Sequence, residues 1–262
     1  MIKRLFTVLI SAFLPYTVSA QNWGGGVDSE TLHFGFTFQY LSSEFKILKK
    51  QDWREPFYDE ETSSFAADSL YSISSPPSPG FGLGFVSDLK LTEHVNLRFT
   101  PGLVFTDRLL DYNYAPQLPV PTPANTIDPN NVIVVPSDSY IQKKVQATMV
   151  DLPVGIKLKS DRIMNYRAYL IGGIKYSMDI ISKKKTDDTG FAPLEKLVKN
   201  NRSFLSYEVG IGLDLYFEFF KLSPEIKLSN SFNSVLTPEE HAFSSPLDKI
   251  FLRNFQFSLY FE

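Results

Sequence analysis

The amino-acid sequence predicts an all-β protein, a transmembrane antiparallel up-and-down β-barrel of about eight strands with short periplasmic turns and long extracellular loops. Three observations support this prediction. Apolar residues alternate with polar or small residues along about eight segments, which is the period of a strand rather than a helix. The connections between these segments are alternately long and short. Aromatic residues are abundant, with 23 Phe and 13 Tyr in 262 residues, as expected for a barrel with lipid-facing aromatic side chains.

The clearest alternation lies in residues 201–229. Odd positions from Leu205 to Phe217 are all apolar, and the even positions between them are polar or small apart from Tyr216. After a reversal near Glu218, the even positions from Phe220 become the apolar ones. Two strands of about ten residues, each with a continuous apolar face, have the length that crosses a bilayer as tilted strands. This segment is therefore expected to form a long β-hairpin.

The other strands follow the same pattern in chain order. They are expected over residues 32–41, over residues 80–91, from Val95 to Phe105, in a segment ending at residues 150–158, from Ala168 to Met178, and from Phe255 to Phe261. Residues 92–94 and 160–161 provide short turns. The long excursions are residues 42–79, 111–139, 182–200 and 230–249. Outer-membrane barrels have an even number of strands with this alternation of loop lengths, whereas nothing requires it in a soluble eight-stranded barrel.

Three prolines fall inside the predicted strands, namely Pro101, Pro153 and Pro224. Proline cannot donate a hydrogen bond to a strand ladder, and a closed barrel has no free edge on which to place it. We therefore expect bulges or local bends at these positions.

The N-terminus has the features of a secretory signal peptide over residues 1–20. Lys3 and Arg4 precede an apolar run over residues 5–14, and Val18-Ser19-Ala20 resembles a cleavage site. The apolar run is too short to be a membrane-spanning helix. Residues 21–262 then form a single barrel domain in the cell outer membrane, with both termini on the periplasmic side.

Composition argues against several functional classes. The sequence has no cysteine and a formal net charge of −3, which leaves no disulfide or cysteine-ligated metal and gives no indication of a nucleic-acid partner. The three histidines, His33, His94 and His241, lack metal-ligand spacing, and there is no Gly-x-Ser-x-Gly motif. We therefore expect no enzymatic activity, no catalytic, metal or cofactor-binding residues, no cofactor and no small-molecule substrate.

An eight-stranded barrel is just wide enough for its own side chains to fill the interior. Charged residues of both signs occupy positions predicted to face inward. They could form a structural network of paired charges or a functional polar conduit, and the small diameter argues against the conduit. The predicted polar network of the lumen consists of Asp88, Arg98, Asp151, Lys157, Arg167, Lys175, Glu208, Asp214, Lys221, Glu225 and Lys227.

Six segments resemble the PorT family, and together they cover nearly every predicted strand. They are HFGFTF (33–38), PGFGLGFVSDLKL (79–91), NLRFTPGLVF (96–105), NYRAYLIGG (165–173), YEVGIGLDLYFEFFKLSPEIKLS (207–229) and FQFSLYFE (255–262). This resemblance implies an outer-membrane component of the type IX secretion system, which exports proteins with a C-terminal signal domain and in some bacteria serves gliding motility. It implies no catalytic residues. One departure is that Glu262 follows Phe261, whereas outer-membrane barrels often finish on an aromatic residue.

A filled barrel of about eight strands cannot pass a protein. The resemblance is therefore compatible with an accessory or assembly role, in which the loops or the barrel wall contact outer-membrane lipid and larger type IX secretion subunits. One alternative is a stand-alone surface adhesin or ligand-binding barrel that uses residues 42–79 as its platform. A further alternative is a small-solute porin.

Overall fold

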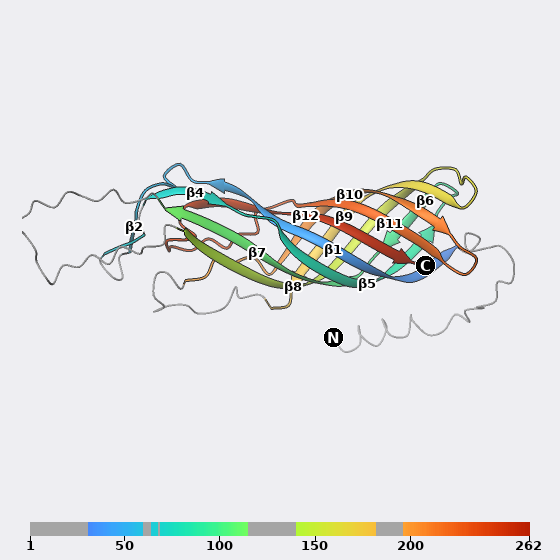
Figure 1. Ribbon diagram of the computed structural model, residues 1–262, viewed down its shortest axis with the longest axis horizontal. Helices are drawn as coiled ribbons and strands as arrows, with labels where there is room; N and C mark the ends of the chain where they lie inside the picture. The colour runs from blue at the N-terminus through green and yellow to red at the C-terminus, as the bar shows by residue number, and fades with distance from the viewer. Residues whose placement is uncertain (1–30, 60–63, 68, 115–139, 182–195) are drawn as a thin grey trace, which may run out of the picture.

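The computed structural model describes residues 31–59, 64–67, 69–114, 140–181 and 196–262, so the predicted signal peptide lies outside the described residues. Most strands belong to one ten-stranded antiparallel sheet, and β2 with β3 forms a small separate hairpin (Figure 1). Within the described ranges, no helix has the length and apolar composition needed to cross a membrane. The strands are β1 (Leu32–Lys49), β2 (Phe57–Asp59), β3 (Ser64–Ala67), β4 (Leu70–Ser74), β5 (Ser78–Lys90), β6 (Val95–Phe99), β7 (Gly102–Tyr114), β8 (Tyr140–Lys159), β9 (Tyr166–Asp179), β10 (Ser203–Tyr216), β11 (Lys221–Ser231) and β12 (Leu247–Phe261).

The sheet closes into a barrel because β1 pairs with both β12 and β5. Strands β6 and β7 are two parts of one strand, since both pair with β5 on one side and with β8 on the other. The closed ring therefore contains eight strands, with β6 and β7 counted together. Each strand neighbours the next one along the chain, and the predicted up-and-down antiparallel barrel is confirmed.

Short and long connections lie at opposite ends of this barrel. The short connections are at the end where β1 begins and β12 finishes (Figure 1). Their alternation with long connections agrees with the prediction. The short connections are residues 91–94, 160–165 and 217–220, and the long ones are residues 50–77, 115–139, 180–202 and 232–246.

Several strands extend further toward the long-connection end than the alternation predicted. Strand β1 continues to Lys49, β7 continues to Tyr114, and β12 already begins at Leu247. The predicted boundaries of the excursions over residues 42–79, 111–139 and 230–249 are therefore wrong. The reason is that these extensions have a different pattern, in which apolar side chains face inward.

The three in-strand prolines disturb the ladder less than expected. Pro101 separates β6 from β7, and its carbonyl oxygen accepts a hydrogen bond from Phe85 N at 2.9 Å. Pro153 lies opposite this break, where its carbonyl oxygen accepts from Thr100 N at 3.2 Å. Pro224 coincides with a gap in the β10–β11 pairing, although its pairing with β12 is continuous. Neither Pro153 nor Pro224 forms a bulge, since the register on either side of each proline is unchanged.

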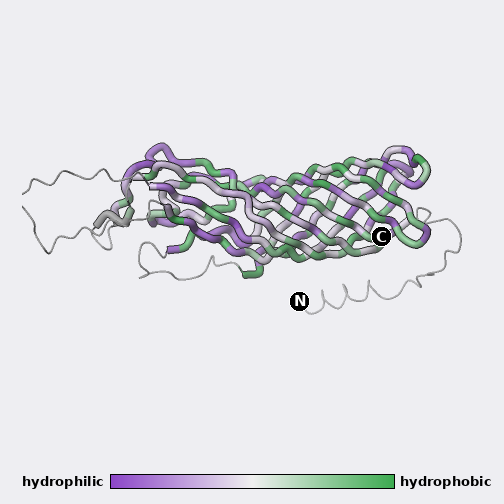
Figure 2. Tube along the Cα trace, viewed as in Figure 1, coloured by the Kyte–Doolittle hydropathy of each residue, from purple (hydrophilic) through white to green (hydrophobic). Residues whose placement is uncertain are grey.

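An apolar belt surrounds the half of the barrel next to the short connections. In Figure 2 this half shows hydrophobic residues alternating with polar ones along each strand. So many exposed large hydrophobic side chains are incompatible with an aqueous surface and indicate contact with lipid. The belt has exposed apolar residues on all eight strands, for example Phe36, Phe85, Phe99, Ile156, Leu170, Val209, Ile226 and Phe255.

The polarity of the wall is reversed in the half next to the long connections. On β1 the inward side chains change from Thr37 to Phe45, and on β12 they change from Ser258 to Ile250, all of them buried. The outward positions at this level carry charges, including the exposed Arg253–Glu44 ion pair. The inward apolar residues form what we call the outer core, which consists of Phe45, Leu70, Ile73, Leu110, Tyr112, Val198, Val235, Leu236, Phe243, Leu247, Ile250 and Leu252.

A side-chain hydroxyl links β1 and β7 at the level where the inward side chains change from polar to apolar. Ser75 lies between β4 and β5. Its Oγ accepts a hydrogen bond from Phe45 N at 2.9 Å and donates one to the carbonyl oxygen of Leu109 at 2.6 Å. Both β4 and β5 pair with β7, so this serine provides hydrogen bonds where the ladder is interrupted.

Candidate functional site

All charged residues predicted for the lumen are buried inside the belt half of the barrel. Each lies on the face of its strand opposite to the apolar belt, because successive side chains of a strand point to opposite faces. The structure places them on β5 (Asp88), β6 (Arg98), β8 (Asp151, Lys157), β9 (Arg167, Lys175), β10 (Glu208, Asp214) and β11 (Lys221, Glu225, Lys227).

Arg98 is the centre of this cluster. Its Nη2 is 2.8 Å from Asp88 Oδ2 and 2.8 Å from Glu262 Oε1, and its Nη1 is 3.2 Å from Glu225 Oε2. The Arg98 side chain is only 1% exposed, and those of Asp88 and Glu225 are 0% exposed. A buried guanidinium retains its charge only with such partners, and the planar fork of arginine suits contacts with several carboxylates.

Two lysines extend the cluster toward the short connections. Lys157 Nζ lies 2.7 Å from Asp214 Oδ1 and 3.5 Å from Asp88 Oδ2. Lys221 Nζ lies 2.6 Å from Glu262 Oε2. The carboxylates of Asp88 and Glu262 are thus each shared between Arg98 and a lysine.

A second row of ion pairs leads from Glu225 toward the outer core. Lys227 Nζ lies 3.1 Å from Glu225 Oε1 and 3.8 Å from Glu208 Oε2. Lys175 Nζ then lies 3.2 Å from Glu208 Oε1 and 3.3 Å from Asp151 Oδ2. Positive and negative groups alternate along this path, so every ion has an oppositely charged neighbour.

Arg167 is the member of the predicted set that these ion pairs do not include. It is buried on β9 and lies directly opposite Asp214 of β10 in the strand register. It has other contacts. The remaining predicted residues are brought together in one connected group, which we call the lumen cluster and which also contains Glu262.

Three residues that contact the predicted charges were not predicted from the sequence. Tyr169 Oη donates a hydrogen bond to Glu225 Oε2 at 2.8 Å, and Tyr260 Oη donates to Glu225 Oε1 at 3.0 Å. Both tyrosines are in phase with inward positions of their strands, so the alternation could have identified them. The third is Glu262, whose side chain enters the lumen while Phe261 stacks on Phe36 outside, with the ring centroids 5.1 Å apart.

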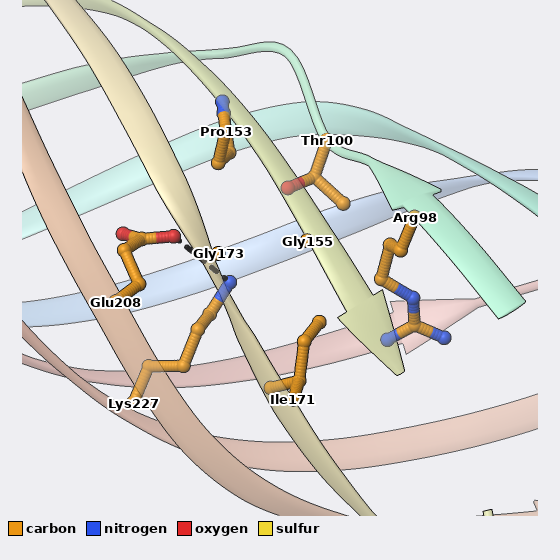
Figure 3. Close-up of a pocket in the computed structure, with 8 residues that line it drawn as sticks. All are labelled: Arg98, Thr100, Pro153, Gly155, Ile171, Gly173, Glu208 and Lys227. Atoms are coloured by element: carbon orange, nitrogen blue, oxygen red, sulfur yellow. Dashed lines mark ion pairs between the residues drawn. The ribbon is translucent and has the colours of Figure 1, made fainter. Parts of the chain in front are cut away.

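Very little space remains between these side chains. A cavity of about 10 Å³ lies beside Glu208 and Lys227 (Figure 3). A buried water molecule needs about this much room. The other lining residues shown there are Arg98, Thr100, Pro153, Gly155, Ile171 and Gly173. The lumen is therefore filled at the level of the cluster, and the outer core fills the barrel nearer the long connections.

Two hollows lie at the outer end of the molecule, where the long connections are. One is polar, has a volume of about 730 Å³ and is lined by residues 49–52, Glu55 and Asp248. The other has a volume of about 200 Å³, shares Asp52 and Glu55 with the first, and includes Trp53 and Tyr58. Partial burial and, to a smaller extent, the charge of Arg54 lower the pKa of Lys49. Among the described residues, no three His, Cys, Asp or Glu side chains form a group that could hold a metal ion.

Comparison with known proteins gives one family. A family model described as "Outer membrane protein beta-barrel domain" matches residues 20–237. No curated protein sequence matches the chain.

Solved structures with a similar arrangement include two bacterial proteins. The Neisserial surface protein A structure has 7% sequence identity and a TM-score of 0.38, covering 88% of this chain and 98% of its own. The outer membrane protein OprG from Pseudomonas aeruginosa has 8% identity and a TM-score of 0.40, covering 88% of this chain and 92% of its own.

Proposed function

This chain belongs to the outer membrane protein β-barrel domain family, and we propose that it serves type IX protein secretion as an outer-membrane accessory or assembly factor. In this role it is required for export of cargo with a C-terminal signal domain, and it is not itself the pore. Its apolar belt contacts outer-membrane lipid.

The observation that carries this proposal is the closed interior. The lumen cluster leaves room for about one water molecule, and the outer core occupies the same barrel nearer the long connections. Eight-stranded barrels of this diameter hold side chains rather than an aqueous channel. A barrel with a closed interior can act only through its outer wall, its turns or its loops.

The link to type IX secretion is supported by the resemblance of the strand segments to the PorT family. We place the short connections and both termini in the periplasm, because outer-membrane barrels have short periplasmic turns and long extracellular loops. The outer core then stands beyond the membrane on the cell surface. Larger secretion subunits would bind this outer part or the barrel wall. The role requires no catalytic residue and no cofactor.

The direct test is deletion of the gene followed by an assay of a signal-domain cargo. We expect the cargo to accumulate in the periplasm and to be secreted again when the wild-type gene is restored. Assembly of an unrelated outer-membrane barrel in the same strain controls for general damage to the envelope. Normal secretion in the deletion strain would overturn the proposed role.

A stand-alone surface-binding protein is the second candidate, and the two hollows at the outer end favour it. They present Tyr58, Asp52 and Glu55 at a surface formed by the first long connection. Replacing Tyr58 and Glu55 by alanine separates the two candidates. A surface-binding protein would lose ligand binding while cargo secretion continues. A small-solute porin is the third candidate, and the filled interior of the described barrel argues against it.

A further inference from the structure

Two neighbouring short connections present large apolar side chains to the surroundings. Phe219, between β10 and β11, is 90% exposed, and Met164, between β8 and β9, is 85% exposed. Ile163 and Phe217 beside them are about half exposed. Short turns of an outer-membrane barrel that face only water have no need of such side chains, so this surface needs a partner.

The two turns are fixed to one another. The backbones of Ile163 and Tyr166 exchange two hydrogen bonds of 3.0 and 3.1 Å across a two-residue loop. A further backbone hydrogen bond joins the two turns, since Tyr216 N donates to the carbonyl oxygen of Asn165 at 2.8 Å. These apolar side chains thus belong to one ordered surface, which we call the turn patch and which consists of Ile163, Met164, Phe217, Phe219 and Phe220.

Met164 has an unusual backbone conformation for its residue type. Its φ is 52°, in the left-handed region, and among the described non-glycine residues it alone has a positive φ. A two-residue hairpin loop with positive φ only at its first position normally has glycine there. A methionine at this position is strained, and it displays a flexible apolar side chain at the tip of the turn.

The turn patch is continuous with the apolar belt. Phe217 and Phe220 are stacked with ring centroids 4.8 Å apart, and Phe220 lies 6.4 Å from Phe261. Phe261 in turn stacks on Phe36 of the belt. The belt itself has a groove of about 640 Å³ on its outer wall. Its apolar lining includes Leu158, Ala168, Leu170, Ile211, Leu213 and Ile226.

The third short connection differs from these two. Leu91, the first residue of this connection between β5 and β6, is 55% exposed, and residues 92–94 are Thr, Glu and His, all of them exposed. The connection borders the β8–β9 turn, since Lys159 N donates a hydrogen bond to the carbonyl oxygen of His94 at 2.8 Å. It has one exposed large apolar side chain, whereas the turn patch has five.

We propose that the turn patch is inserted into the lipid of the adjacent leaflet, at the boundary between headgroups and acyl chains. The partner is a phospholipid surface, because the patch continues a surface that already contacts lipid. Aromatic and other apolar side chains next to charged residues suit this boundary, and Arg162 and Glu218 provide such charges. The turn patch consequently lies deeper in the membrane than the polar residues 92–94 of the third short connection. This inference rests on the outer-membrane barrel and is independent of a role in secretion.

Tryptophan reporters test the proposal. The sequence has two tryptophans, Trp23 and Trp53, so a background in which both are replaced by phenylalanine has no tryptophan fluorescence. In this background Phe219→Trp reports on the turn patch, and His94→Trp is the matched control on the polar turn. Each variant is refolded into vesicles of phosphatidylethanolamine and phosphatidylglycerol brominated near the top of the acyl chains. We expect bromine to quench the Phe219→Trp variant at least about twice as strongly as the His94→Trp variant, and aqueous iodide to show the opposite order.

Equal quenching at both positions, or preferential quenching of position 219 by iodide, would overturn the proposal. Folding of each variant is verified by heat-modifiable gel mobility, and Met164→Trp provides a second reporter if Phe219→Trp does not refold. A photocrosslinker placed at position 219 in native outer membranes distinguishes a lipid from a protein partner. Crosslinks to lipid support the proposal, and a dominant crosslink to one protein would replace lipid as the occupant.

Discussion

At the scale of single residues, the fold depends on how Arg98 is neutralised. This guanidinium contacts carboxylates from β5, β11 and the residue after β12, and it thereby connects distant parts of the ring. Breaking a buried ion pair by removing one partner leaves an uncompensated charge, which is far more costly than losing an exposed pair. The lumen cluster is therefore expected to be intolerant of single changes.

Replacing Arg98 with leucine tests this expectation. We expect Arg98→Leu to reduce the free energy of unfolding by about 3–5 kcal/mol, because the carboxylates of Asp88, Glu225 and Glu262 each lose one of their buried cations. Arg253→Leu is the matched control, since Arg253 pairs with Glu44 on the exposed face at 3.3 Å. Its expected effect is at most about 1 kcal/mol. Urea titration of the barrel refolded into vesicles measures both, and similar losses for the two variants would contradict the assigned role of Arg98.

At the scale of elements, glycine allows β8 and β9 to pack closely against one another. Gly173 of β9 lies opposite Gly155 of β8, and a Cβ on Gly173 would collide with the carbonyl oxygen of Val154. The adjacent Gly172 faces outward, where the nearest atom to a Cβ would be the carbonyl oxygen of Glu208 at 3.9 Å. Gly172 and Gly173 thus have different roles, and only Gly173 is needed for the close packing of β8 against β9.

A pair of alanine substitutions distinguishes these roles. Gly173→Ala is expected to lower the free energy of unfolding by about 1–3 kcal/mol, since β8 and β9 must move apart. Gly172→Ala should change it by no more than about 0.5 kcal/mol. The same urea titration measures both variants. Equal stability of the two would show that β8 and β9 are not in close contact at this point.

The sequence pattern predicted the number of strands in the ring, but it predicted neither their full length nor strands β2, β3 and β4 of the first long connection. Alternation identified the belt half of every strand, because outward apolar and inward polar residues recur with period two. The outer half of β1 keeps the same period, with Phe45 and Ile47 inward, but its outward residues include Glu44 and Lys46. In the sequence alone such a segment resembles a polar loop, because only the packing of neighbouring strands shows which of its faces is buried.

The inward phase of the strands placed the predicted charged residues in the lumen, but it gave none of their ion-pair partners. Which carboxylate meets which cation depends on the stagger between strands far apart in sequence, such as β6 with Arg98 and β11 with Glu225. Glu262 was missed because it follows the last residue of β12, and the turn patch was missed because exposure of Met164 and Phe219 has no periodic signal.

At the scale of the whole molecule, one barrel is adapted to two media. Near the short connections it is apolar outside and charged inside, and near the long connections it is polar outside and apolar inside. The second half has the construction of a water-soluble domain, so it is expected to stand beyond the membrane. Burial of the outer core and pairing of the lumen charges then stabilise different parts of the same sheet.

Removal of a core side chain from the second half tests this division. Phe243 is fully buried, and its carbonyl oxygen accepts a hydrogen bond from Tyr112 Oη at 2.7 Å. Phe243→Ala should destabilise the outer half by about 3–5 kcal/mol and admit protease between β11 and β12, while the belt half stays folded. Phe232→Ala, at a half-exposed position of the same connection, should have little effect. Limited proteolysis followed by heat-modifiable mobility of the protected fragment separates the two halves, and global unfolding of Phe243→Ala would contradict the division.

The central claim is that the interior is closed along its length, so the protein acts through its surfaces and not as a conduit. Single-channel recording of the purified wild-type barrel in a planar bilayer tests this claim most directly, with a porin in the same bilayer as positive control. We expect no stepwise conductance after insertion, because the lumen cluster and the outer core each fill the cross-section. Reproducible open steps of constant amplitude would contradict the closed interior and would favour a solute-conducting barrel.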